Sequence, residues 1–343
     1  MAKRPVLGIT MGDPAGIGPE ISVKALMLQK IRSVCTPILI GDAAFMARVA
    51  KDVNKVDWKI NAISNPSEAK DRDGIIDIID QKTVDETDFK FGRVSAMCGE
   101  AAFAAVRKAI ELALAGEIDG TVTNALNKEA INLAGHKYDG HTEIYADLTR
   151  SQNYAMMLAD EKLRVVHCTT HIRMTEVAGR LTKERILEVI RLGDLAVRKF
   201  GVEKPRVAVA GYNPHAGESG LFGSEEIEII TPAVNAAKAA GYDVTGPVPP
   251  DTVFCKAAGG AFDLVVAMYH DQGHIPMKLL SFKFDAKTMK WSDMLGVNIT
   301  LGLPIIRTSV DHGTAFGHAG MGLANPNSLI YAIECGALLA KKD

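Results

Sequence analysis

The segment MGDPAGIGPE, residues 11–20, lies between the apolar run Val6–Met11 and a stretch that we expect to be helical from Pro19 onward. Gly16 and Gly18 would let the backbone approach a ligand closely, and the start of the helix would favour an anion. The dinucleotide fingerprint G-x-G-x-x-G requires a third glycine, which this segment lacks. The segment therefore predicts a strand–turn–helix unit of an α/β fold, without the fingerprint of the dinucleotide-binding Rossmann folds.

The same alternation of short β-branched runs and helical patterns continues along the chain. The apolar content of the strand candidates is nearly continuous, as expected where helices cover both faces of a sheet. Amphipathic periodicity predicts helices over Glu100–Gly116 and Leu181–Phe200, the second with Thr182 as its N-cap. The alternation predicts a largely parallel sheet. The predicted strands are Val6–Met11, Pro37–Ile40, Ile75–Ile79, Gly120–Thr123, Leu163–His167, Val207–Ala210, Leu264–Tyr269 and Val297–Leu301.

Length and composition limit the possible classes of protein. The chain has 343 residues, more than the roughly 250–300 at which one hydrophobic core stops growing, so we expect two lobes. Lys and Arg number 39 against 41 Asp and Glu, which argues against a nucleic-acid partner. No apolar run approaches the roughly 20 residues that cross a bilayer, and no C-x-x-C pair occurs among five cysteines. These features favour a cytoplasmic protein without a membrane partner.

Three histidines follow strand-like runs, namely His171, His215 and His270. The carboxyl ends of strands in an open α/β sheet form the edge where ligands bind, so three imidazoles there would suit a divalent metal. For each histidine alone, a hydrogen-bonding role at the strand end is the simpler interpretation. The neighbouring turns, NPHAGE and YHDQG, are crowded with polar side chains that contribute little to a core. This crowding favours the metal site.

Two further regions carry candidate binding groups. The glycine-rich stretch 311–327, DHGTAFGHAGMGLANPN, has no obvious strand or helix, and such loops often carry function. Basic and polar residues near strand or loop boundaries suit phosphate or carboxylate, although most such residues are solvated surface groups. These residues include His141, Thr142, Lys278, Asn298 and Arg307.

Eight ordered motifs resemble the 4-hydroxythreonine-4-phosphate dehydrogenase family over nearly the whole chain. They are GDPAGIGPE, GHTE, TTH, NPHAGE, GP-x-PPDT, YHDQGHIP-x-K, GVNITLGLP and IRTSVDHGTA. The resemblance implies a two-lobed α/β/α fold with a mixed sheet, similar to the isocitrate and isopropylmalate dehydrogenases. We expect one lobe over residues 1–130 plus 300–343 and the other over 131–299. The resemblance also implies a homodimer whose active sites combine residues of both chains.

Matched position by position, the resemblance implies a role for each motif. His171, His215 and His270 would bind a divalent metal (Zn, Mg, Co or Mn), with the Asp251 carboxylate beside it. The implied substrate-binding residues are His141, Thr142, Lys278, Asn298 and Arg307. The implied contacts to NAD are His312, Gly313, Thr314, Ala315 and Asn325, with Gly16 and Gly18 placed more loosely near substrate or cofactor. Asp251 and Lys278 are both candidates for relaying the proton.

The implied reaction is oxidation, with decarboxylation, of a 3-hydroxy acid phosphorylated on C4. The wording of LFGSEE and PPDTVF is closer to the branch that converts D-threonate or D-erythronate 4-phosphate to dihydroxyacetone phosphate and CO₂. The alternatives are oxidation of 4-phosphooxy-L-threonine in pyridoxal phosphate biosynthesis, oxidation of an aromatic cis-dihydrodiol carboxylate, and metal-dependent hydrolysis. A hydrolase would have no use for a dinucleotide loop at 311–327.

The sequence departs from the family pattern in two places. Asn124-Ala125 stands where the family commonly has Ala-Pro. An extra piece at about 282–295, containing Trp291, separates Lys278 from Asn298 and is expected to border the pocket. The second departure bears on the choice of substrate more than on the class of reaction.

Overall fold

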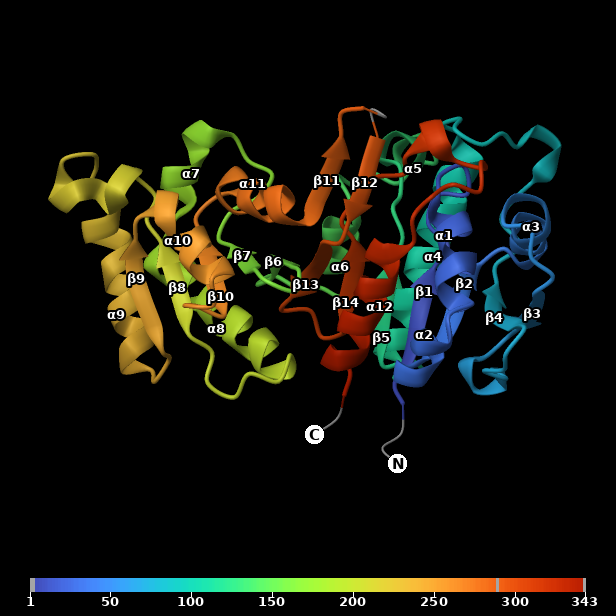
Figure 1. Ribbon diagram of the computed structural model, residues 1–343, viewed down its shortest axis with the longest axis horizontal. Helices are drawn as coiled ribbons and strands as arrows, with labels where there is room; N and C mark the ends of the chain where they lie inside the picture. Colours follow the sequence, from blue (N-terminus) through green and yellow to red (C-terminus); the bar gives the residue numbers. More distant parts are fainter. Residues whose placement is uncertain (1–3, 288–289, 342–343) are drawn as a thin grey trace. The chain divides into compact units, whose positions relative to one another are not determined.

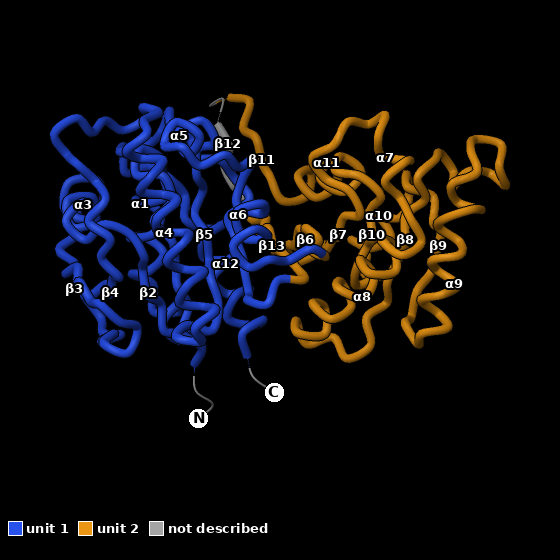
Figure 2. The backbone as a smooth tube through the Cα atoms, turned by 180° about the vertical axis from the view of Figure 1, so that it is seen from behind, with its two compact units in different colours: residues 1–152, 303–343 blue, residues 153–302 orange. Residues whose placement is uncertain are grey.

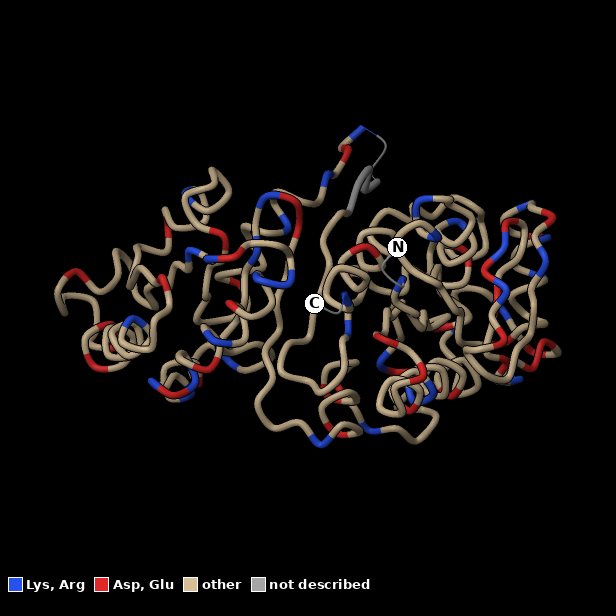
Figure 3. Tube along the Cα trace, turned by 90° about the horizontal axis from the view of Figure 1, so that it is seen from below, with Lys and Arg blue, Asp and Glu red and all other residues tan. Residues whose placement is uncertain are grey.

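The computed structural model describes residues 4–287 and 290–341. The chain divides into two compact units, the first formed by residues 1–152 with 303–343 and the second by residues 153–302 (Figure 2). Charges of both signs are interspersed along each unit (Figure 3). Within the described ranges, every helix is too short or too polar to cross a membrane.

The first unit is built on six parallel strands in the order β3-β4-β2-β1-β5-β14 (Figure 1). Parallel pairing requires helical crossovers, which cover the sheet on both faces. The strands are β1 (Val6–Thr10), β2 (Thr36–Gly41), β3 (Lys59–Ile63), β4 (Ile75–Asp80), β5 (Gly120–Thr123) and β14 (Arg307–Val310). The helices are α1 (Gly18–Leu26), α2 (Gln29–Val34), α3 (Ala43–Arg48), α4 (Ala96–Leu114), α5 (Lys128–Leu133), α6 (His141–Leu148) and α12 (Asn327–Leu339).

Helices α4 and α12 cover opposite faces of this sheet. The α4 side chains Ala105, Ala109 and Leu112 share a buried cluster with Ile38 and Ile40 of β2. Helix α12 packs against β5 and β14. Because these helices cover the faces of the sheet, the groups at the carboxyl ends of the strands come from the loops that follow the strands.

The second unit has a mixed sheet in the order β13-β6-β7-β10-β8-β9. Strand β6 is antiparallel to both of its neighbours in this unit, whereas β7, β10, β8 and β9 are parallel. The strands are β6 (Ala155–Ala159), β7 (Arg164–His167), β8 (Val207–Ala210), β9 (Val244–Val248), β10 (Leu264–Ala267) and β13 (Val297–Leu301). The helices are α7 (Met174–Arg180), α8 (Lys183–Lys199), α9 (Thr231–Ala239), α10 (Pro250–Ala258) and α11 (His270–Ser281).

The extra piece at 282–295 forms an antiparallel hairpin. Its strands are β11 (Phe282–Asp285) and β12 (Lys290–Met294). The described part of the chain excludes residues 288–289 and the side chain of Trp291. The prediction that this segment borders the pocket with Trp291 therefore lies outside the described residues.

The predicted fold class is confirmed, because the protein is α/β with a mixed sheet and all eight predicted strands are present. The predicted cap of the second helix is also confirmed, since the Arg185 amide donates to Thr182 Oγ1 at 3.0 Å. The first helix begins earlier than predicted, at Ala96, because the Ser95 hydroxyl accepts from the Cys98 amide and caps it there. Strands β3, β6, β9, β11, β12 and β14 were not predicted.

Candidate active site

The three predicted metal ligands follow the carboxyl ends of three neighbouring parallel strands. Strand β10 lies between β7 and β8, and the loops after these strands carry His270, His171 and His215 respectively. Strand β9 pairs with β8 on the outer side, and the exposed Asp251 follows it in the first turn of α10. Four candidate groups from distant parts of the sequence therefore lie along one edge of the second unit.

The rings of His171 and His270 lie close together, with centroids 5.6 Å apart. Two imidazoles that bind one ion through nitrogens at 2.0–2.1 Å place their ring centres roughly 5 Å apart, so this pair fits a shared ion. The Nδ1 atom of His270 is 2.7 Å from Asp271 Oδ1, an arrangement that directs Nε2 towards a metal. Within residues 4–287 and 290–341, no three His, Cys, Asp or Glu side chains converge on one point.

Two further histidines, not predicted from the sequence, pack against this pair. The ring of His274 stacks on His270 at 3.6 Å, and His167 lies 4.7 Å from His274. Burial lowers the pKa of His167 to about 4 and that of His274 to about 3, so both imidazoles are neutral at pH 7. The spacing of four residues between His270 and His274 within α11 was the signal that they share a helix face.

Side chains of the unit tie the histidine loops to one another. Thr169 Oγ1 donates to the Met268 carbonyl at 2.8 Å, joining the loop of His171 to the end of β10. Gln272 accepts from the Met268 amide at 2.6 Å and donates to the Gly211 carbonyl at 2.7 Å. The loops after β7, β10 and β8 are thereby linked in a continuous chain of hydrogen bonds.

The structure places the predicted residues Lys278 and Asn298 in the same unit. Lys278 lies on α11, with Nζ 4.6 Å from the ring centroid of Phe282. Asn298 lies on β13, and its buried Oδ1 has no hydrogen-bond partner among the described residues. An unsatisfied buried acceptor is costly, which suits a group that a ligand completes.

In the first unit, the structure brings the predicted substrate-binding residues His141 and Arg307 together. The Arg307 guanidinium is 3% exposed, donates to Thr123 Oγ1 at 2.9 Å, and lies 5.5 Å from the ring centroid of Tyr145. Burial lowers its pKa to about 10. Burial and this neighbouring cation hold the pKa of His141 well below its usual range. Within the part of the chain that the structure describes, the buried Nε2 of His141 has no hydrogen-bond partner.

This pair has the character of an anion site. Arginine offers a planar fork of five N–H donors that matches a carboxylate or a phosphate. A neutral imidazole beside it adds a donor or an acceptor without adding charge. Thr142, the other predicted residue here, is buried in the first turn of α6.

The two glycine-rich segments of the first unit lie against each other. The Ile17 amide donates to the Thr314 carbonyl at 3.0 Å. A Cβ at Gly16 would lie 2.9 Å from that carbonyl oxygen, so only glycine fits there. The predicted cofactor residues His312, Gly313 and Ala315 flank this contact, with Asn325 further along the same loop.

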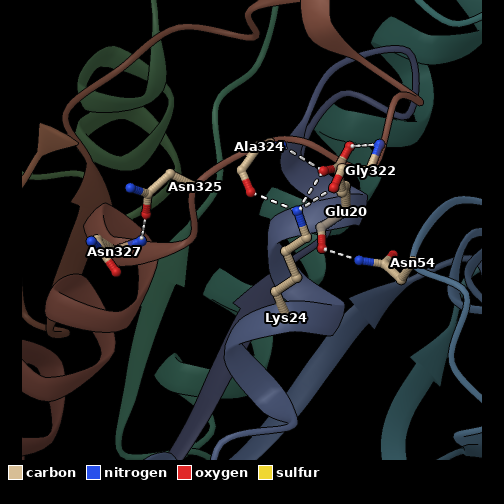
Figure 4. A network of polar contacts seen from close by, with 7 residues as sticks. All are labelled: Glu20, Lys24, Asn54, Gly322, Ala324, Asn325 and Asn327. Carbon is tan, nitrogen blue, oxygen red and sulfur yellow. Dashed lines mark hydrogen bonds and ion pairs between the residues drawn. The ribbon is translucent and has the colours of Figure 1, made fainter. Parts of the chain in front are cut away.

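The far part of this loop is held by an ion pair that sequence reasoning missed (Figure 4). The buried Glu20 carboxylate accepts from the amides of Gly322 and Ala324 at 3.1 and 2.6 Å. Lys24 Nζ, 2.7 Å from Glu20, donates to the carbonyls of the same two residues. Next to them, the Asn325 side chain accepts from the Asn327 amide at 2.8 Å. Loop 311–327 is therefore anchored to α1.

The departure at Asn124 has a local structural explanation. Its fully buried amide donates to the Thr10 carbonyl at 2.9 Å and to Ser22 Oγ at 2.8 Å, so it joins β5 to β1 and α1. Asp13 lies in the adjoining turn with 1% exposure, and burial raises its pKa to about 6. Asp13 belongs to the turn that holds Gly16, and Asn124 lies against Gly12 and Gly18, which flank this turn.

Comparison with known proteins identifies the family. The family model described as pyridoxal phosphate biosynthetic protein PdxA matches residues 33–336. D-threonate 4-phosphate dehydrogenase of Pectobacterium atrosepticum is 48% identical over 337 residues, covering 98% of this chain and 99% of the relative. The crystal structure of 4-hydroxythreonine-4-phosphate dehydrogenase from Klebsiella pneumoniae has a TM-score of 0.86 at 45% identity, covering 99% of both chains.

A more distant relative has a different substrate in its name. The terephthalate 1,2-cis-dihydrodiol dehydrogenase of Burkholderia xenovorans has a TM-score of 0.66 at 30% identity, covering 95% of this chain and 96% of that one. Fold and relatives together define an oxidoreductase of the dehydrogenase class. Within that class, the chain belongs to the PdxA family.

Proposed function

We propose that the protein is an NAD-dependent, divalent-metal-assisted dehydrogenase that oxidises D-threonate or D-erythronate 4-phosphate. The products would be dihydroxyacetone phosphate, CO₂ and NADH. The observation that carries the proposal is the buried guanidinium of Arg307 beside the neutral imidazole of His141, because such a pair suits an anionic, hydroxyl-bearing substrate. The 48% identity to a D-threonate 4-phosphate dehydrogenase supports the choice of substrate.

The roles of the chain's own residues follow from their chemistry. Arg307, with His141 and Thr142, would bind and orient the anionic substrate, and Lys278 and Asn298 are assigned to the same task. Orientation of this kind lowers the barrier because the entropy of alignment is lost on binding and not at the reaction step. Asp251 and Lys278 remain the two candidates for moving the proton.

The histidines His171, His215 and His270 would hold the metal, in keeping with the 5.6 Å separation of two of them and the neutral imidazoles around them. When bound, a divalent ion supplies positive charge that favours loss of a proton from a neighbouring hydroxyl. The Asp271 carboxylate would keep the His270 ring oriented.

Loop 311–327 is our candidate for binding NAD, through His312, Gly313, Thr314, Ala315 and Asn325. The chemistry that bound NAD would supply is acceptance of a hydride from the substrate carbon. The 3-oxo acid so formed would lose CO₂ and take up one proton at the adjacent carbon. The anchoring of the loop by Glu20 and Lys24 supports this role, because a binding loop must keep its shape while exposed.

We further propose a homodimer whose active sites combine residues of both chains. Exposed apolar side chains gather on α11 and β11, where Leu279 is 81% exposed and Ile275 64%. Leu280 and Phe284 extend this apolar surface. Apolar side chains gathered in this way commonly mark a protein–protein interface.

The proposal is tested by measuring NADH formation with NAD, a divalent metal and each candidate substrate beside its unphosphorylated form. Turnover of D-threonate or D-erythronate 4-phosphate alone would support it. Turnover of 4-phosphooxy-L-threonine alone would favour pyridoxal phosphate biosynthesis, the second candidate, which the 45%-identical Klebsiella structure supports. Turnover of an aromatic cis-dihydrodiol carboxylate would favour the third. Phosphate release without NAD binding would instead indicate a hydrolase.

A further inference from the structure

The loop that carries His215 has an unusual backbone. Five consecutive residues, 215–219, adopt left-handed conformations with φ between 42° and 80°, and four of them are not glycine. A left-handed conformation costs roughly 1–2 kcal/mol for each non-glycine residue. Such a run persists only where the surrounding structure fixes it, and runs of this kind cluster at functional sites.

The group that fixes this loop is the buried carboxylate of Glu226, which begins the helical turn Glu226–Ile230. Glu226 is 3% exposed and accepts from the backbone amides of Tyr212 and Asn213, each at 2.7 Å. It also accepts from the Asn213 side chain at 2.9 Å. A buried carboxylate with three N–H donors is held by strong, charge-assisted hydrogen bonds.

Gly217 and Gln272 complete the enclosure. A Cβ at Gly217 would lie 2.7 Å from Glu226 Oε2, and φ there is 80°, so only glycine allows the loop to fold around the carboxylate. Gln272, on α11, holds the Gly211 carbonyl. Gly211, Tyr212 and Asn213, which shortly precede His215, are thereby held by Gln272 and Glu226.

We infer that Glu226 is a positioning residue that sets where His215 presents its imidazole relative to His270. The inference rests on the proposed metal site. Ligands must be held within about 0.5 Å of their bound positions, and an exposed loop cannot achieve this by packing alone. His215 is exposed, so it has little packing of its own, and the carboxylate beneath the loop provides the missing constraint.

The test compares Co²⁺ binding by purified full-length variants. Glu226→Gln keeps the size of the side chain but removes its charge, and the new amide nitrogen must face either the side-chain amide of Asn213 or the backbone amides of Tyr212 and Asn213. Glu228→Gln makes the same chemical change on an exposed residue of the same helical turn and is the matched control. His215→Ala gives the reference for loss of a ligand. Co²⁺ affinity and the visible absorption bands of bound Co²⁺ report the coordination, and hydrogen exchange of residues 211–223 reports the loop.

We expect Glu226→Gln to weaken Co²⁺ binding about 10- to 100-fold and to change the absorption bands. We also expect faster exchange of the loop amides, an unchanged melting temperature, partial rescue in Glu226→Asp, and wild-type binding in Glu228→Gln. If Glu226→Gln keeps the wild-type affinity and spectrum while His215→Ala loses Co²⁺ binding, the inference about Glu226 is wrong and the proposed metal site still stands. A wild-type protein that binds no Co²⁺ would overturn the metal proposal and the inference together.

If Glu226→Gln does not fold, Asn213→Ala provides the same test. It removes only the side-chain hydrogen bonds to Glu225 and Glu226 and keeps both backbone bonds. We expect a several-fold weaker affinity for Co²⁺, and an unchanged affinity would refute the inference.

Discussion

Replacing Arg307 with Met tests whether this buried cation serves binding or folding. Methionine is similarly long, unbranched and uncharged, so it fills the space without the charge. If the guanidinium exists for an anionic substrate, the protein without substrate bears the cost of burying it. Arg307→Met should then make the protein more stable and less active.

The expected gain in stability follows from the pKa of Arg307. Burial lowers this pKa from 12.5 to about 10, so the charged form is disfavoured in the folded state by roughly 3 kcal/mol, at about 1.36 kcal/mol per pKa unit. The substitution also loses the hydrogen bond to Thr123 and the contact with the Tyr145 ring, which contribute about 1 kcal/mol each. The net gain is therefore at most about 1 kcal/mol, or a melting temperature higher by about 2–4 °C.

The expected loss of activity follows from the contacts to substrate. Removing one partner of a buried charge pair costs about 2–5 kcal/mol, which corresponds to roughly a 30- to 5,000-fold lower kcat/KM. Steady-state kinetics with D-threonate 4-phosphate and calorimetry of the substrate-free protein measure the two effects. Arg307→Lys keeps the charge but not the fork, so it should lower kcat/KM without raising the melting temperature. Arg191→Met, on the surface of α8, should change little.

A lower melting temperature together with unchanged kinetics in Arg307→Met would refute this reasoning. That result would mean that the guanidinium stabilises the fold through its neighbours and does not contact substrate. A lower melting temperature with lower activity would leave the binding role intact and refute the stability calculation.

Three further predictions concern other parts of the molecule. Because the pKa of Asp13 is raised, the folded state keeps a proton between about pH 4 and 6 that the unfolded state releases. The free energy of unfolding therefore falls as pH rises through this window, and the full loss persists above pH 6. Asp13→Asn should therefore stabilise the protein by about 2 kcal/mol more at pH 7.5 than at pH 4.5 in denaturant titrations, and equal gains would contradict the assignment. Glu20→Gln should loosen loop 311–327 and raise the KM for NAD about 10-fold at nearly constant kcat, and a change in kcat alone would exclude the anchoring role. Leu279→Asp should convert a dimer to monomers in sedimentation experiments, and an unaffected dimer would place the interface elsewhere.

Most strands that sequence reasoning found have a nearly continuous apolar run, with Gly120–Thr123 as an exception. Strand β6, AMMLA, is apolar and fully buried and was nevertheless missed, because Ala and Met are not among the residues enriched in strands. Three other missed strands lack a continuous apolar run. Strand β9, VTGPV, contains Gly246 and Pro247, which argue against a strand, and it lies at the edge of its sheet. Strand β3 is likewise an edge strand and is largely exposed. Strand β14, RTSV, is buried but polar, because Arg307 and its neighbours belong to the candidate site.

The residues of the candidate site also divide into those that the sequence predicts and those that it does not. The three candidate ligand histidines could be placed at one edge from the sequence, because each follows a strand and the order of strands brings them there. Glu20 and Gln272 could not be predicted, because their partners are set by tertiary structure. The amide that Glu20 accepts from at Ala324 is 304 residues away in the sequence. No local pattern encodes a hydrogen bond across such a separation.

In each of the two units, a buried glutamate carboxylate holds a candidate functional loop in place. Loop 211–219 is mostly polar and loop 311–327 is rich in glycine, so each needs polar contacts to fix its shape. In each case a buried glutamate at the start of a helix accepts backbone amides from the loop, Glu20 in the first unit and Glu226 in the second. Because a buried carboxylate is costly unless its lone pairs are satisfied, the amides and the carboxylate depend on each other. Removal of either carboxylate should therefore loosen a functional loop while leaving the sheet beneath it intact.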